Sequence, residues 1–168
     1  INASKAFSCK EMYRIVTSEG LDVEVVSGGE LYTALQAGVP GKNIHFQGNN
    51  KTVRELEFAI DNNVSDIVVD NFAELELLGK LAREKGKTVR VSLRIKPGID
   101  AHTHEFIRTG QVDSKFGLDL ASGEALQAVD RAIEMNGVKL IGLHCHIGSQ
   151  IMEKEPFVHA AEVMLELH

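Results

Sequence analysis

The chain has 168 residues, of which 43% are hydrophobic and 25% are charged, an ordinary composition for a globular domain with a core of its own. The formal net charge of −6 is modest and the Lys and Arg residues are dispersed, which argues against a nucleic-acid or anionic-membrane partner. No apolar run approaches the roughly 18 to 20 residues of a membrane span, and no signal segment is evident, so we expect a single cytoplasmic domain over residues 1–168 with a small-molecule ligand.

A short β-rich run followed by a segment with helical periodicity recurs six times along the chain. The expected strands are residues 2–7, 21–26, 43–47, 66–70, 88–95 and 138–143. The expected helices are residues 9–19, 31–38, 52–62, 71–81, 122–135 and 156–168. Ser27 and Glu30 have the spacing of a capping box, so we expect Ser27 to cap the second helix and Glu30 to bond back to that cap.

Residues 99–120 break this rhythm, because they are polar and show no clear periodicity. Loops of that length inside compact domains are usually functional or disordered. The stretch contains Arg108 and Lys115, two cations that can receive a substrate carboxylate or simply lie exposed.

Six successive βα units predict an α/β fold in which helices cover a parallel sheet. Such a sheet is either open and doubly wound or closed into a (β/α)8 barrel. No Gly-x-Gly-x-x-Gly follows the first strand, so the dinucleotide-binding form of the open sheet is unsupported. A barrel needs eight units and usually about 200 residues or more, so we expect a partial barrel from a longer protein. Its two exposed edges would need a covering partner or leave the piece marginally stable.

The last expected strand runs into the sequence GLHCHIGSQ at residues 142–150, and the carboxyl ends of parallel strands are where ligands bind. His144 and His146 project from the same face of this strand. They suit a stacked or hydrogen-bonded ring, a metal site or a plain structural role. A zinc site needs three or four ligands. The other candidate ligands follow no familiar spacing: His45, Asp70, His102 and His104.

Other polar residues also fall at strand ends. Lys5 is a solvated surface charge or, when desolvated, a Schiff-base nucleophile. Ser149, next to Gly148, would lie at a helix N-terminus, as an anion site or a simple cap. Glu24 and Arg94 lie on expected strands, so each must be paired or face the mouth of the barrel.

Several motifs together resemble the diaminopimelate decarboxylases and their ornithine and arginine decarboxylase relatives. They are NASKAF, DVEVVSGGELYTALQAGVP, IHFQGNNK, VVDNFAELELL, LRIKPGIDAHTHEFIRTGQVDSKFGLD and GLHCHIGSQ. The resemblance covers essentially the whole chain, and AHTHEFIRTGQ with DSKFG points to the diaminopimelate branch. It implies an alanine-racemase-like barrel, pyridoxal phosphate as cofactor, an amino-acid substrate and a homodimer with shared sites.

The resemblance also implies roles for single residues. Lys5 falls on the lysine that bonds to the cofactor aldehyde. His146 falls on a histidine that stacks on the pyridine ring, and Ser149 on a serine that contacts the phosphate. Glu24 falls where relatives carry an aspartate near the cofactor, and Arg94 on an arginine near its phenolic oxygen.

The function implied is the decarboxylation of meso-diaminopimelate to L-lysine. Relatives usually have Tyr before Ala-x-Lys, where this chain has Asn2, and their glycine-rich phosphate loop and Glu-Pro-Gly-Arg segment have no counterpart here, so we expect no turnover by this chain alone. Three alternatives stay open: another basic amino-acid decarboxylase, a non-catalytic barrel that binds a partner, and a metal hydrolase that uses His144 and His146. Arg108 is the candidate for binding substrate.

Overall fold

A single parallel sheet of seven strands organises the computed structural model, which describes residues 1–98 and 115–167. The strands are β1 (Asn2–Ala3), β2 (Val23–Val25), β3 (Ile44–Phe46), β4 (Asp66–Val69), β5 (Val89–Lys96), β6 (Leu118–Asp119) and β7 (Val138–Cys145). Strands β1 to β5 are neighbours in sequence order. Strand β5 also pairs with β7 along most of its length and, at its carboxyl end, with the short β6.

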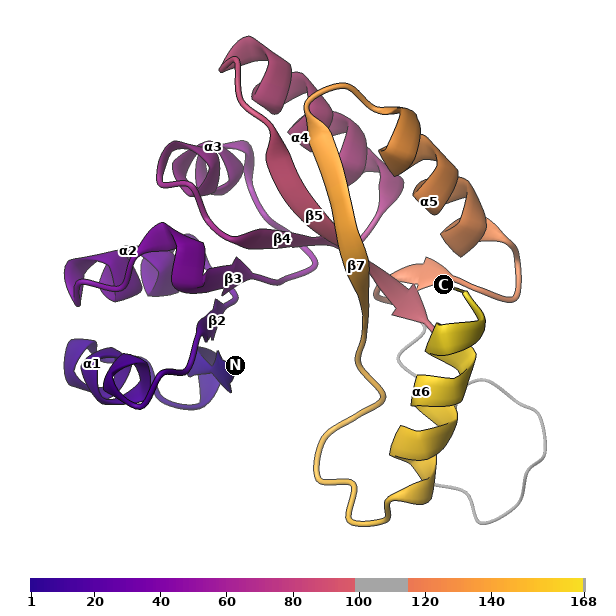
Figure 1. Ribbon diagram of the computed structural model, residues 1–168, viewed down its shortest axis with the longest axis horizontal. Coiled ribbons are helices and arrows are strands. Elements are labelled where there is room, and N and C mark those ends of the chain that lie inside the picture. Colours follow the sequence, from indigo (N-terminus) through magenta and orange to yellow (C-terminus); the bar gives the residue numbers. More distant parts are fainter. Residues whose placement is uncertain (99–114, 168) are drawn as a thin grey trace.

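Helices alternate with the strands along the chain. They are α1 (Lys10–Ser18), α2 (Gly28–Gln36), α3 (Val53–Asp61), α4 (Phe72–Glu84), α5 (Glu124–Glu134) and α6 (Glu155–Glu166), with short 3-10 turns η1 (Ser4–Ala6) and η2 (Gly41–Asn43). Helices α1 to α4 follow one another along one side of the sheet (Figure 1). No helix in the described part of the chain is long and apolar enough to cross a membrane.

Strand alternation gives the sheet one apolar face and one polar face. The core under the helices contains Val23, Val25, Ile44, Phe46, Ile67, Val69, Val91 and Leu93. On the other face, the strand register places Glu24 beside His45 and His45 beside Asp66. Further along, Arg94 lies beside His144. The inner face of this partial barrel is therefore lined with ionisable side chains.

The structure confirms the predicted α/β fold of about six βα units. The addition is β6, which was expected to be part of an irregular loop; its two residues pair with the last two residues of β5. Residues 99–114, which make up most of that loop and include Arg108, lie outside the described residues.

Half of the predicted capping box at the start of α2 is correct. The Ser27 hydroxyl accepts the Glu30 N–H at 3.2 Å, as expected. The prediction that Glu30 bonds back to its own cap is wrong, because its Oε2 instead accepts the Val26 N–H at 2.9 Å and lies 2.9 Å from the Ser4 hydroxyl. Glu30 therefore ties α2 to the segment that follows β1.

A complete capping box, which the sequence interpretation missed, begins α3. The Thr52 hydroxyl accepts the Glu55 N–H, and the Glu55 carboxylate accepts the Thr52 N–H at 2.8 Å. The other Glu55 oxygen accepts the Gly28 N–H at 2.7 Å. One carboxylate therefore joins the amino ends of α2 and α3 and helps to keep the adjacent βα units in register.

Candidate active site

Three charged side chains from distant parts of the sequence lie near one another at the strand ends. Lys5 lies in η1, directly after β1, and is exposed, whereas Glu24 is half-buried on β2. Burial raises the pKa of Glu24, while the positive charges of Lys5, His45 and Arg94 act in the opposite direction. The charges of Lys5 and Arg94 thus both act on the Glu24 carboxylate.

The turn that carries Lys5 is held by its neighbour Ser4, which is buried. The Ser4 hydroxyl donates to the Glu24 carbonyl oxygen at 2.7 Å and also contacts the Glu30 carboxylate. The Phe7 N–H donates to the Ser4 carbonyl oxygen at 3.0 Å and closes the turn. These contacts hold the backbone on either side of Lys5, whose side chain is exposed.

His144, on the inner face of β7, contacts the far side of the sheet. Its Nε2 lies 3.1 Å from the side-chain nitrogen of Gln47, which follows β3. Burial, together with the positive charges of Arg94 and His146, lowers the pKa of His144 to about 4. The ring is therefore neutral at pH 7. Its Nδ1 is buried and has no hydrogen-bond partner among the described residues.

His146 lies just beyond β7 and lines a cavity of about 380 Å³ between the end of that strand and α6. The other lining residues are largely apolar and include Cys145, Phe157 and Met164. Lys5, Glu24 and Arg94 do not line this cavity.

Ser149 is exposed, and the prediction that it lies at a helix N-terminus is wrong. Gly148 has a φ of +129° and Gln150 a φ of 58°, values that prevent the chain from entering a right-handed helix there. Helix α6 begins only at Glu155, with Pro156 in its first turn. The Ser149 hydroxyl is therefore presented by an irregular segment between β7 and α6.

The metal alternative has no ligand set in the described part of the chain, where no group of three or more His, Cys, Asp or Glu side chains can hold an ion. His45, one of the candidates, instead lies between Asp22 at 3.3 Å and Asp66 at 3.8 Å. These carboxylates raise its pKa, Asp66 most strongly. His102 and His104 lie outside the described residues.

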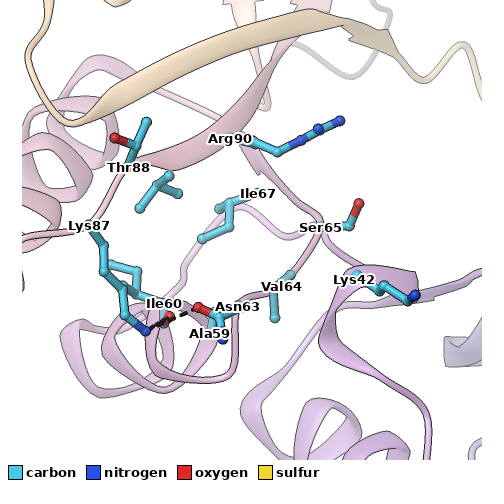
Figure 2. A pocket seen from close by; sticks show the side chains of 11 residues that line it. Lys42, Ala59, Ile60, Asn63, Val64, Ser65, Ile67, Lys87, Thr88 and Arg90 are labelled. Carbon is cyan, nitrogen blue, oxygen red and sulfur yellow. Dashed lines mark hydrogen bonds between the residues drawn. The ribbon is translucent and has the colours of Figure 1, made fainter.

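A second hollow, of about 300 Å³, lies at the opposite ends of the strands, where β4 and β5 begin (Figure 2). Three cations line it: Lys42, Lys87 and Arg90. The Lys87 amine already donates to the Ile60 carbonyl oxygen at 2.8 Å and contacts the Asn63 side chain at 3.2 Å, so it caps the carboxyl end of α3. This hollow is remote from Lys5 and Glu24.

Sequence reasoning missed a buried group of charges behind Arg94. Lys51, which follows β3, forms an ion pair with Glu74 of α4 at 2.6 Å. Asp70, which follows β4, forms an ion pair with Arg94 at 3.1 Å. Asp70 was considered only as a metal ligand. A usable signal was present, because Lys51 comes shortly after one expected strand and Asp70 is the last residue of another, at the end where ligands bind.

This partial βα barrel brings a lysine, a carboxylate, an arginine and a neutral histidine together at its strand ends. It belongs to the class of barrels that bind small polar ligands there. Comparison with known proteins identifies the family. The family model described as "Pyridoxal-dependent decarboxylase, pyridoxal binding domain" matches residues 1–168, and the chain belongs to this family.

The relatives include diaminopimelate decarboxylases. That of Halalkalibacterium halodurans is 52% identical over 98% of this chain and 37% of its own length. That of Bacillus subtilis is 52% identical over 95% of this chain and 36% of its own. The crystal structure of the M. jannaschii enzyme in complex with L-lysine has a TM-score of 0.90 and 40% identity, and the match covers 99% of this chain and 38% of that one. The chain thus spans little more than a third of the relatives' length.

The predicted resemblance is therefore confirmed, and with it pyridoxal phosphate as the cofactor of the family. The side chains present fit that group in part. Lys5 offers an exposed amine to an aldehyde, and Arg94 offers a cation to an anionic oxygen. The buried, unpartnered Nδ1 of His144 adds a polar atom in the same region.

Proposed function

We propose that this chain forms the cofactor-binding barrel portion, residues 1–168, of an enzyme that decarboxylates meso-diaminopimelate to L-lysine. The observation that carries the proposal is the convergence of Lys5, Glu24 and Arg94 at the strand ends of a chain half-identical to diaminopimelate decarboxylases. L-lysine is present in the related M. jannaschii crystal structure. The lysine/ornithine and arginine decarboxylases from Vibrio vulnificus and a Chlorella virus are only 22% identical, which supports a shared fold alone.

When bound, pyridoxal phosphate supplies an electron sink for the electron pair left by carbon dioxide. In this proposal, Lys5 would hold the cofactor at its aldehyde group through Nζ until a substrate amine takes its place. Glu24, whose pKa burial raises, can hold or release a proton next to Lys5. Arg94 holds an anionic oxygen, and His146 packs against the ring and orients it. Ser149 binds the phosphate through its hydroxyl.

The whole protein is proposed to act as a homodimer in the cytoplasm, with further residues that bind substrate supplied outside the described ranges. Arg108 is the candidate within this chain for the substrate carboxylate. The inner face of the sheet supports this arrangement, because its polar lining needs further strands or a partner to enclose a ligand.

The test measures carbon dioxide release and L-lysine formation by the complete polypeptide with meso-diaminopimelate, ornithine and arginine. We expect kcat/KM to be highest for meso-diaminopimelate. The Lys5→Ala variant should lose about a hundredfold or more of kcat because it removes the nucleophile. Lys10→Ala, which alters an exposed lysine at the start of α1, is the matched control. A preference for ornithine or arginine, or an active Lys5→Ala variant, would contradict the proposal.

A further inference from the structure

Lys51 is a lysine with almost no exposure, in a position that none of the proposed chemistry explains. Its side chain is 1% exposed, and its amine forms an ion pair with Glu74 Oε1 at 2.6 Å. The amine also donates to the carbonyl oxygens of Val68, at 2.8 Å, and Gly48. It lies 5.7 Å from the centre of the Phe46 ring. A lysine is rarely buried in this way unless it is paired or functional.

Glu74 transmits this contact to the end of β4. Its second oxygen, Oε2, accepts the backbone N–H of Asp70 at 3.1 Å. Its own N–H is accepted by the side chain of Asn71, which caps α4. These two hydrogen bonds hold the backbone of the turn from β4 into α4. They therefore also hold Asp70, which lies in this turn.

Asp70 in turn holds Arg94. The carboxylate oxygen of Asp70 lies 3.1 Å from Arg94 Nη1, and the two side chains are 6% and 11% exposed. Two carboxylates, Glu74 and Asp70, thus lie between two cations along a buried line from Lys51 to Arg94. Only the last of these, Arg94, is electrostatically coupled to both Glu24 and His144 at the strand ends.

Arg94 is also contacted by the Phe116–Gly117 pair of the Ser-Lys-Phe-Gly motif. The guanidinium lies 5.3 Å from the centre of the Phe116 ring. Gly117 has a φ of +83°, and a Cβ there would lie 2.9 Å from the Arg94 carbonyl oxygen and 3.2 Å from its Cγ. The motif therefore packs directly on Arg94.

Stability alone does not account for the Lys51–Glu74 pair, because apolar residues of similar size often replace a buried ion pair without loss of stability. Glu74 links the pair to Asp70 at the end of β4, and Asp70 forms an ion pair with Arg94. We propose that Lys51 and Glu74 are positioning residues, which act through Asp70 to hold the Arg94 guanidinium in place for the cofactor. This inference rests on the proposed function.

The decisive variants are Lys51→Met and the double variant Lys51→Met/Glu74→Met in the complete protein. The double variant leaves no unpaired buried charge, so it is expected to fold, but it removes the acceptor of the Asp70 N–H. Three quantities are measured: the Kd for pyridoxal phosphate, the pH midpoint of the bound cofactor's absorbance change, and the Tm of the cofactor-free protein.

We expect both variants to bind pyridoxal phosphate about tenfold more weakly or worse. We also expect the pH midpoint to rise. The positive charge of Arg94 favours the deprotonated form of the bound cofactor, and this effect weakens when Arg94 is displaced. In an Arg94→Met background, the double substitution should add no further shift. Lys85→Met, which removes the exposed Lys85–Asp61 ion pair, is the matched control and should leave both quantities unchanged.

A double variant with wild-type Kd and wild-type pH midpoint would overturn the inference, whatever its Tm, and so would a shift that persists in the Arg94→Met background. If Lys51→Met fails to fold, the double variant alone decides. A wild-type protein that binds no pyridoxal phosphate would contradict the proposed function itself, and that result is visible before any variant is made.

Discussion

The protonation of single residues on the inner face of the sheet depends on burial and on the charges next to them. Glu24 is pushed towards its protonated form by burial, and His45 is held towards its protonated form by Asp66 and Asp22. His144 is held neutral. The face therefore combines a carboxyl whose pKa is raised with a histidine that is neutral at pH 7.

The neutral state of His144 predicts a specific acid sensitivity. Its pKa is about 4 in the folded protein against an ordinary value of 6.5, so the unfolded chain binds the extra proton first as the pH falls. The free energy of unfolding should therefore drop between pH 6.5 and pH 4 by about 3 kcal/mol more in the wild type than in His144→Asn. Urea unfolding across this pH range measures the difference.

The control for this experiment is His159→Asn, which replaces an exposed histidine on α6. It should retain the pH dependence of the wild type between pH 6.5 and pH 4. Parallel curves for wild type and His144→Asn would show that the folded protein accepts the proton on His144 freely.

The sequence could identify Lys5, Glu24 and Arg94 as candidates, because a charged residue on or at the end of an expected strand must be paired or face the mouth of the barrel. It could not pair Lys51 with Glu74, because Glu74 lies 23 residues further along the chain, on α4. Nor could it place Ser149 correctly, since the positive φ of Gln150 is a local conformation that the motif alone does not dictate.

At the scale of elements, helical periodicity and cap residues predicted six helices and six main strands close to where they lie. The prediction failed where tertiary contacts decide the structure. Strand β6 has two residues and exists through its pairing with the end of β5, so no periodicity could reveal it. Ser149 does not begin a helix, because the segment after β7 first turns through Gly148 and Gln150; α6 begins at Glu155, within one residue of the expected start.

The segment between residue 115 and β6 offers a direct test of close packing on Arg94. Gly117→Ala and Gly123→Ala both place a side chain at positive φ, +83° and +82°, which costs about 1–2 kcal/mol. Only at Gly117 would the new Cβ also meet another residue, the backbone of Arg94, whereas nothing lies within 4 Å at Gly123. We therefore expect Gly117→Ala to lower the Tm more than Gly123→Ala.

Thermal unfolding of the two variants in the cofactor-free protein checks this expectation. Gly123→Ala is the internal control, because it carries the backbone strain without the contact. Equal losses of Tm would mean that the segment moves away from the new side chain without loss of stability, and that it does not confine Arg94.

At the scale of the whole molecule, the chain is a curved parallel sheet with helices on its apolar face and ionisable groups on its inner face (Figure 1). The family's pyridoxal binding domain matches all of it, while the chain spans only 36–38% of the first relatives' length. We propose that this inner face holds pyridoxal phosphate through Lys5.

Reductive trapping tests that claim most directly. The complete protein is incubated with pyridoxal phosphate, reduced with borohydride, digested and mapped by mass spectrometry, with Lys5→Ala as the control. We expect one stable pyridoxyl group, on Lys5, and its loss in the variant. An adduct on another lysine such as Lys51 or Lys10, or no adduct on the complete protein, would contradict the account.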